Sequence, residues 1–190
     1  MRYFKLITIL FLLIFSLSCR KDYTPRPRGY FRIDFPEKSY ESFKSDCDFT
    51  FEIPEYGEII ESNVRNAEPC WYNLEFKQNG AKVYITYKPL NNNLPEHVED
   101  VRKIVYKHII KADDILETRI SIPENKVYGI MYDIEGNAAS SVNFYITDSI
   151  SGFLSGSLYF DVQPNSDSLA PAIDFFREDI VHLINSFHWR

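Results

Sequence analysis

The 190-residue chain has few of the residues from which reactive sites are built. It contains seven glycines, and they form neither the G-x-G-x-x-G pattern nor the P-loop pattern that cradles phosphate groups. It contains four histidines, which are His97, His108, His182 and His188. None has the i,i+4 spacing with a second ligand type that a helical metal site requires. The sequence therefore offers no cofactor-binding motif and no metal site, and we expect neither.

Spacing also excludes two weaker motifs. Within Gly152–Gly156, Ser155 stands one position too late for the G-x-S-x-G nucleophile elbow, and it falls inside a predicted strand. Asp161, Asn165 and Asp167 carry oxygens that Ca²⁺ could use, but their spacing is not that of an EF-hand loop. Asn, Ser and Asp ahead of a helix usually cap it. We therefore name no catalytic residue and expect no enzymatic activity.

Positive charge is scarce relative to negative charge. The chain has 21 Lys and Arg residues against 27 Asp and Glu residues. Residues 1–18 hold two of the cations and none of the anions, so the rest of the chain carries a net charge of about −8. Binding to nucleic acid depends on cations that neutralise phosphates. This balance excludes a nucleic-acid partner.

No apolar run is long enough to cross a bilayer, which takes about 20 residues. The longest run, Leu6–Leu17, has 12 residues and follows the cations Arg2 and Lys5. Small Ser18 then precedes Cys19. This order is typical of a secretory signal, and a cysteine at the cleavage point predicts a bacterial lipoprotein acylated at Cys19. An ordinary signal peptide cut nearby stays open as the alternative, because a Ser stands three residues before the cysteine, where the lipobox usually has Leu.

Cysteines are rare as well, since the chain has three. If Cys19 is acylated, Cys47 and Cys70 remain as one pair in an oxidising compartment. We predict a disulfide between them, which would close a loop of about 24 residues and contribute about 3 kcal/mol in the chain-entropy model. Two buried thiols are the alternative.

Alternating apolar and polar residues predict strands through most of the remaining sequence. The predicted strands are Gly29–Pro36, Phe49–Ile53, Glu58–Glu61, Cys70–Phe76, Ala81–Lys88, Thr118–Ile122, Val127–Ile134, Ser140–Thr147 and Phe153–Val162. Asn79-Gly80 is a strong signal for a two-residue hairpin turn. No parallel βαβ alternation is present. We predict one α+β domain over residues 29–190, with an antiparallel sheet of about six to eight strands.

Helical periodicity occurs twice. Apolar residues at steps of three and four predict one helix from Pro95 to Ala112 or Ile115. A second stripe, Leu169–Phe187, predicts a helix that Ser166 or Ser168 caps, with Pro171 in its first turn. Each helix is amphipathic, so we expect both to pack on the sheet.

The segment between Cys19 and the domain is polar and contains prolines. Residues 19–28 are therefore predicted to be a lipidated tether. At its junction with the domain, cations alternate with aromatic residues. These residues are Arg26, Arg28, Tyr30, Phe31 and Arg32. Arginine and aromatic side chains dominate the energetics of interfaces, so they are a candidate partner-binding surface. The alternative is that the arginines pair with the domain's own acidic surface or with anionic head groups.

Several stretches together resemble the gliding-motility lipoprotein GldD family of Bacteroidetes. They are the signal segment, the stretch Pro25–Ile33, the stretches Leu158–Phe160 and Pro164–Pro171, and the closing Trp189. The resemblance implies a cell-envelope lipoprotein, lipid-anchored and facing the periplasm. It further implies a role in gliding motility and in the linked type IX secretion system, through contacts with other lipoproteins or outer-membrane components. It implies no enzymatic activity and assigns no functional residue.

A Bacteroidetes source would also imply O-glycosylation at Asp, then Ser or Thr, then an apolar residue. Ser149 and Ser168 stand in such triplets, although turn and cap chemistry explains both triplets equally. Two rival functions remain. A hydrolase-like enzyme would need a concave site with perturbed titratable groups. An envelope domain that binds a small ligand or peptidoglycan would need aromatic residues that line an open pocket, whereas core packing would place them inside.

Overall fold

The computed structural model describes residues 34–190, which form ten strands and two α-helices. The strands are β1 (Tyr40–Lys44), β2 (Phe49–Pro54), β3 (Glu58–Glu61), β4 (Tyr72–Phe76), β5 (Ala81–Pro89), β6 (Ala112–Ile122), β7 (Val127–Gly136), β8 (Ser140–Thr147), β9 (Gly152–Phe160) and β10 (His188–Trp189). The helices are α2 (Leu94–Tyr106) and α3 (Ser166–Asn185), with short 3₁₀ turns η1 (Lys107–Ile110) and η2 (Pro123–Asn125). The predicted α+β class is confirmed.

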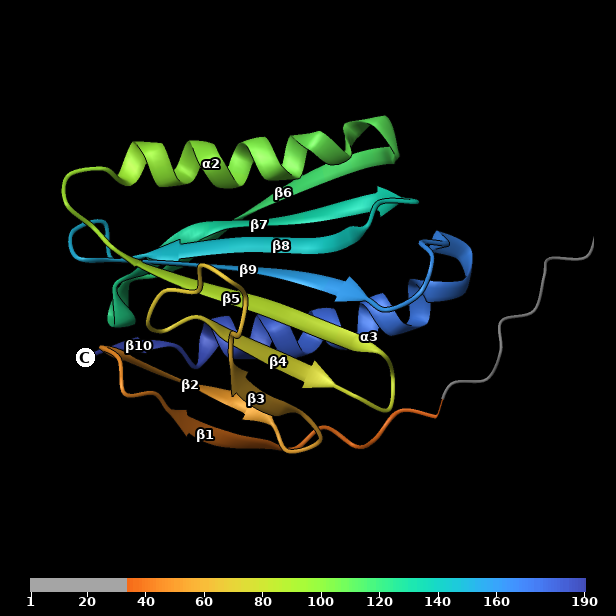
Figure 1. The fold of residues 1–190 in the computed structure, drawn as a ribbon, viewed down its shortest axis with the longest axis horizontal. Coiled ribbons are helices and arrows are strands. Elements are labelled where there is room, and N and C mark those ends of the chain that lie inside the picture. Colours follow the sequence, from red (N-terminus) through yellow and green to blue (C-terminus); the bar gives the residue numbers. More distant parts are fainter. Residues whose placement is uncertain (1–33) are drawn as a thin grey trace, which may run out of the picture. The chain divides into compact units, whose positions relative to one another are not determined.

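Strand pairing is antiparallel throughout the described residues. Seven strands form one sheet in the order β3-β4-β5-β9-β8-β7-β6 (Figure 1). Strands β4 and β5 form the predicted hairpin, but residues 77–80 make a four-residue loop instead of the predicted two-residue turn. A second sheet, β1-β2-β10, was not predicted, because β10 has two residues and the pattern of β1 is mostly polar.

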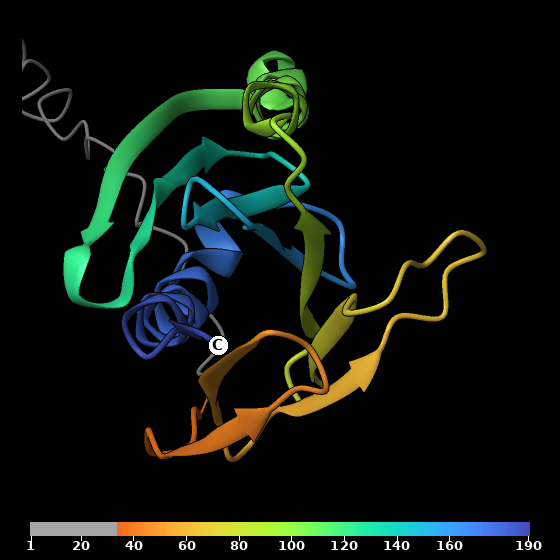
Figure 2. The same cartoon turned by 90° about the vertical axis from the view of Figure 1, so that its left-hand side faces the viewer.

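The helices cover opposite faces of the seven-stranded sheet. Helix α2 lies on one face, and α3 lies with the three-stranded sheet on the other (Figures 1 and 2). The larger core fills the α3 side with 22 buried residues, whereas the core beneath α2 has seven. Strand β8 is buried at every position because it is covered on both faces.

The apolar stripe of α3 explains its position. Phe176, Ile180 and Leu183 are buried, and each such side chain contributes about 1.5–3 kcal/mol when it leaves water. The helix begins after Asn165, whose side chain accepts a hydrogen bond from the Ser168 N–H at 3.2 Å, so the predicted serine caps were wrong. Pro171 lies inside the helix instead of in its first turn, where it removes one backbone donor.

The predicted first helix was too long. Helix α2 ends at Tyr106, the chain tightens into η1, and β6 begins at Ala112. The spacing of apolar residues continues into η1, but these residues are not buried there, since Ile109 is 60% exposed. Of the predicted strand at Gly29–Pro36, residues 34–36 are not in a strand and the remainder lies outside the described residues.

Glycine permits close packing at the start and in the middle of β9. A Cβ on Gly156 would lie 2.3 Å from the Phe144 ring, and one on Gly152 would lie 2.5 Å from the Trp189 ring. Trp189 also donates through Nε1 to the Lys126 carbonyl at 3.2 Å. The closing tryptophan is thus part of the fold, because it holds β10 against the sheet.

Candidate functional site

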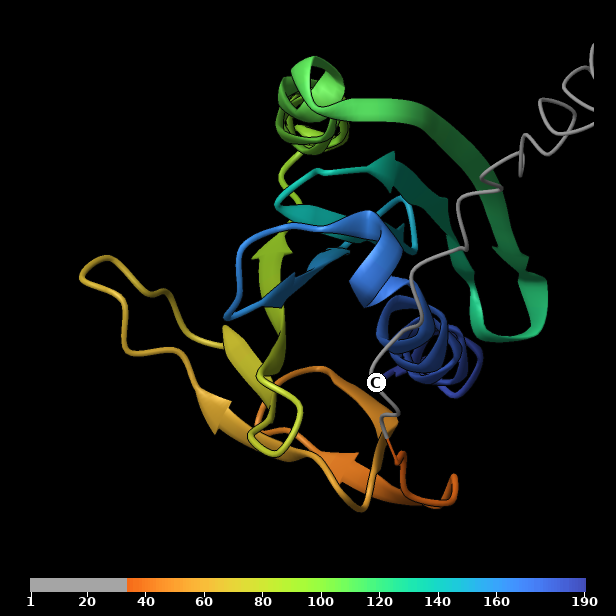
Figure 3. The ribbon, with the colours of Figure 1, turned by 90° about the vertical axis from the view of Figure 1, so that its right-hand side faces the viewer.

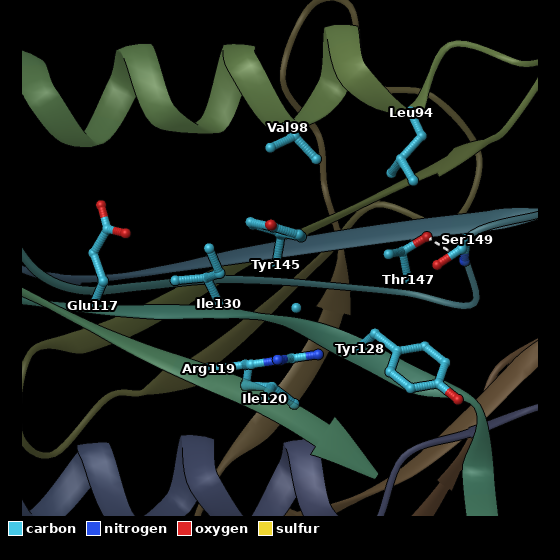
Figure 4. Close-up of a pocket in the computed structure, with 11 residues that line it drawn as sticks. Leu94, Val98, Glu117, Arg119, Ile120, Tyr128, Ile130, Tyr145, Thr147 and Ser149 are labelled. Atoms are coloured by element: carbon cyan, nitrogen blue, oxygen red, sulfur yellow. Dashed lines mark hydrogen bonds between the residues drawn. The ribbon is translucent and has the colours of Figure 1, made fainter. Parts of the chain in front are cut away.

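The surface of the described residues is hollowed beneath α2. This groove has a volume of about 410 Å³ and lies between the helix and strands β6, β7 and β8 (Figure 4). Its lining residues are Leu94, Val98, Glu117, Arg119, Ile120, Tyr128, Gly129, Ile130, Tyr145, Thr147 and Ser149. The groove exists because α2 contributes one fully buried residue, Val105, and covers its face of the sheet incompletely.

The groove has an apolar interior and a polar rim. Leu94 and Val98 point from α2 toward Tyr145 on β8, while Glu117 and Arg119 stand on β6 (Figure 4). Glu117 accepts a hydrogen bond from the Tyr106 hydroxyl at 2.9 Å. An apolar recess bordered by both signs of charge suits a protein segment better than it suits chemistry on a small substrate.

An open sheet edge adjoins the groove. Strand β6 is 11 residues long and stands last in the strand order, so within the described residues it pairs with β7 alone. Among residues 34–190 no strand pairs with its outer edge, so the backbone N–H and C=O groups there have no strand partner in that range. Such an edge can accept an added strand from another chain.

The opposite side of the domain contains a buried charged cluster. Asp179 on α3 is 3% exposed. Its carboxylate accepts hydrogen bonds from Lys38 Nζ at 2.7 Å, from the Tyr40 hydroxyl at 2.9 Å and from the Tyr56 hydroxyl at 2.8 Å. We call Lys38, Tyr40, Tyr56 and Asp179 the α3 clasp. It joins the first described residues to the last helix, across more than 120 positions of sequence.

Aromatic stacking reinforces the clasp. Phe35 stacks on Phe175 with ring centroids 4.3 Å apart, and Tyr40 stacks on His182 at 3.5 Å. Burial, together with hydrogen bonds to Asp179, raises the pKa of Tyr40 and of Tyr56 well above the ordinary value. Both phenols therefore stay protonated donors. A charge that is paired and hydrogen-bonded on every side has a structural role.

The predicted disulfide is confirmed. Cys47 and Cys70 are joined, with Cα atoms 6.1 Å apart and 23 positions between them in sequence. The bridge ties the start of β2 to the start of β4, and it packs beside Tyr72. It thereby connects the small sheet with the large one.

Both predicted glycosylation serines are exposed. Ser149 lies in the β8–β9 turn, where the Asp148 carboxylate accepts hydrogen bonds from the N–H groups of Ile150, Ser151 and Gly152. Burial raises the pKa of Asp148, but these bonds outweigh it and lower the pKa overall. Ser168 lies in the first turn of α3. Cys19 and the candidate surface of Arg26, Arg28, Tyr30, Phe31 and Arg32 lie outside the described residues.

Several residues that could carry chemistry have hydrogen-bond partners of their own in the described part of the chain. His97 contacts Asn93, His182 pairs with Glu52 at 2.6 Å, and Ser155 shares a hydrogen bond with Thr86 at 2.7 Å. Within residues 34–190, no three His, Cys, Asp or Glu side chains are grouped to hold a metal ion. No helix in the same range is long and apolar enough to span a membrane.

Comparison with known protein families identifies the family to which the chain belongs. The family described as "Gliding motility lipoprotein GldD" matches residues 20–189. The chain belongs to this family. It is therefore a gliding-motility lipoprotein by family, and such lipoproteins are anchored to a membrane of the cell envelope. The matched range includes the disulfide, the groove and the clasp.

Two further comparisons give the fold's wider context. No curated protein matches the chain significantly. Among solved structures, it is similar to cyanobacterial PsbP (CyanoP) from Synechocystis sp. PCC 6803. The TM-score is 0.49 at 10% sequence identity, over 82% of this chain and 95% of that one.

Sequence analysis of this GldD-family chain missed the clasp, although a signal for it exists. Asp179 follows Phe176 by three positions and precedes Leu183 by four, so it falls within the apolar stripe of α3. A carboxylate at such a position must find partners, because an unpaired buried charge is costly. The partners Lys38, Tyr40 and Tyr56 are distant in sequence, and no local pattern indicates them.

Proposed function

We propose that this lipoprotein is a non-catalytic support of the gliding machinery and of the linked type IX secretion system, which it serves through protein–protein contacts. The groove beneath α2 carries the proposal. It joins an apolar recess to a charged rim and to the edge strand β6, which has one strand partner among the described residues. Membership in the family supports the same role. The partners would be other lipoproteins or outer-membrane components.

A pair of charge reversals tests the groove. Arg119→Glu changes an exposed side chain on the groove wall, and Arg65→Glu changes an exposed side chain in the β3–β4 loop. Exposed substitutions usually shift stability by about 0.5 kcal/mol or less, so both variants should fold and reach the membrane. Gliding and secretion should fail with Arg119→Glu and persist with Arg65→Glu. A stable, fully motile Arg119→Glu strain would contradict the proposal.

The anchor is proposed to be acyl chains on Cys19. Two or three chains give stable attachment, whereas one chain gives marginal attachment. Cys19→Ala should release the protein from membranes or block its maturation, as fractionation and immunoblotting would show. A processed Cys19→Ala protein at the wild-type level in the membrane fraction would refute acylation.

The junction residues Arg26, Arg28, Tyr30, Phe31 and Arg32 are proposed as a second contact surface. Three cations within seven residues contrast with the acidic remainder of the chain. Reversing Arg28 and Arg32 together should preserve folding and membrane attachment but abolish gliding. A motile double variant would reduce this segment to a spacer and leave the groove as the contact surface.

The alternative, binding of a small ligand or peptidoglycan in the envelope, has less support. It requires aromatic residues gathered at an opening. Among the residues that line the groove, Tyr128 and Tyr145 alone are aromatic. Most other aromatic side chains pack with one another in the large core, as Phe49, Phe51 and Phe187 do.

A further inference from the structure

The end of α2 and the following turn form an exposed apolar corner. Within residues 34–190, nine large hydrophobic side chains are strongly exposed, and five of them lie between residues 104 and 116. They are Ile104, Tyr106, Ile109, Ile110 and Leu116. Ile110 is 85% exposed, which is the largest value among the nine. A folded domain rarely presents adjacent isoleucines to water without a partner for them.

The same corner is locally basic in an acidic protein. Residues 102–111 read RKIVYKHIIK, with four Lys and Arg residues and no carboxylate, although the whole chain carries a net charge of −6. Lys111 follows the two isoleucines directly, Lys107 precedes them by two positions, and both lysines are exposed. Carboxylates resume at Asp113. Apolar side chains surrounded by long cationic ones are typical of protein surfaces that rest in a lipid head-group region.

The described chain begins at the same end of the domain. The start of the described chain, the C-terminal end of α2 and the start of α3 all lie at the right-hand end in Figure 1, and Figure 3 faces that end. Cys19 precedes Asp34 by 15 residues, which span at most about 50 Å when extended. The β8–β9 turn, with Ile150 80% exposed, lies at the other end (Figure 1).

We propose that the corner of Ile109 and Ile110, with Lys107 and Lys111, contacts the surface of the membrane that holds the lipid anchor. The isoleucines enter the head-group region, while the lysines reach anionic phosphates. This contact orients the domain, so the groove beneath α2 keeps a fixed direction relative to the bilayer. The inference rests on the proposed acylation of Cys19.

Two labelled variants of the full lipidated protein test the contact. Ile110→Cys and Ile150→Cys replace isoleucines of similar exposure at opposite ends, and each would carry an environment-sensitive fluorophore. Without reductant, the Cys47–Cys70 disulfide does not react with the label. The proteins are reconstituted into vesicles of phosphatidylethanolamine and phosphatidylglycerol, with or without a nitroxide-labelled phospholipid as quencher.

Flotation is measured first, and quenching follows. The label at position 110 should lose about half of its emission or more to the lipid quencher, while the label at 150 should be nearly unaffected. If the protein floats but both labels are quenched equally, or the label at 110 is not quenched, the membrane contact is wrong while the lipid anchor is supported. Protein that does not float overturns both. Cross-linking of an unquenched position 110 to an envelope protein would show that the corner is a protein interface instead.

Discussion

The two faces of the seven-stranded sheet differ in how completely they are covered. On one face, α3 buries six of its residues and the small sheet adds β1, β2 and β10. On the other face, α2 buries Val105 alone. The α3 face contains the clasp and contacts the disulfide, whereas the α2 face contains the groove, the open edge of β6 and the exposed corner.

This difference suggests that one face of the sheet stabilises the domain and the other contacts partners. On the α3 side, the buried carboxylate of Asp179 is satisfied within the domain by Lys38, Tyr40 and Tyr56. On the α2 side, apolar and charged side chains remain exposed around a recess. We infer that the α3 face holds the domain together and that the α2 face is free to meet other components.

The largest expected effect comes from breaking the clasp. Asp179→Ala leaves the Tyr40 and Tyr56 hydroxyls without their acceptor, and the Lys38 ammonium keeps the Phe175 carbonyl but loses its buried counter-ion; removing one partner of a buried pair costs about 3–5 kcal/mol. Chemical denaturation would measure this loss in the free energy of unfolding. Glu178→Ala is the matched control, because Glu178 is 72% exposed and lies 3.9 Å from the same ammonium. If Asp179→Ala lowers the free energy of unfolding by less than about 1 kcal/mol, the clasp does not stabilise the domain as we propose.

The disulfide should contribute slightly less than the clasp to the free energy of unfolding. Replacing Cys47 and Cys70 together with serine should lower the free energy of unfolding by about 3 kcal/mol, since the unfolded chain regains the freedom of a 23-residue separation. Wild-type protein in reductant should show the same loss, and the double variant in reductant should show no further change. Two alkylatable thiols in protein from the envelope would contradict the bridge.

A pH effect distinguishes the α2 side. Tyr132 is 1% exposed beneath α2, and burial raises its pKa to about 12 from an ordinary value of 10.0. Its protonated form stabilises the fold fully below pH 10, and that contribution is lost as pH rises from 10 to about 12. The loss should reach roughly 3 kcal/mol, as denaturation at several pH values would show. Tyr40 and Tyr56, whose pKa values are also raised, add to the same slope, so Tyr132→Phe should reduce the slope without abolishing it. An unchanged slope would contradict the contribution of Tyr132.

The smallest effect on stability concerns the two glycosylation triplets. Ser149 lies at the mouth of the groove, so a glycan there would narrow the contact surface, while one on Ser168 would lie at the start of α3. We predict added mass on the envelope protein that Ser149→Ala, Ser168→Ala or both remove, with little change in melting temperature. Intact mass equal to the acylated polypeptide alone would rule out glycosylation.

The sequence predicted what local periodicity controls. Strand β3 was predicted with its observed ends, and β8 likewise. The stripe of α3 was predicted as well. The end of α2 was not, because Ile109 continues the helical period in sequence while the chain turns away toward β6.

The candidate surfaces were less predictable. The groove depends on how far α2 lies from Tyr145 and on where Arg119 meets Tyr128 at its rim, and these are tertiary facts. Strand β10 near the C-terminus pairs with β2 near the start of the described chain. This pairing could not be predicted, because a strand of two residues is too short to show an alternating pattern. The Cys47–Cys70 bridge was predictable, because the proposed acylation of Cys19 leaves one pair.

Site-specific photo-cross-linking in gliding cells tests the division of the two faces most directly. A photoreactive residue would replace Glu117 on the groove wall or Glu178 on α3, both of which are exposed. The account predicts that a motile strain with the probe at 117 forms a covalent adduct with an envelope protein, and that the strain with the probe at 178 does not. An adduct from 178 with none from 117 would contradict it.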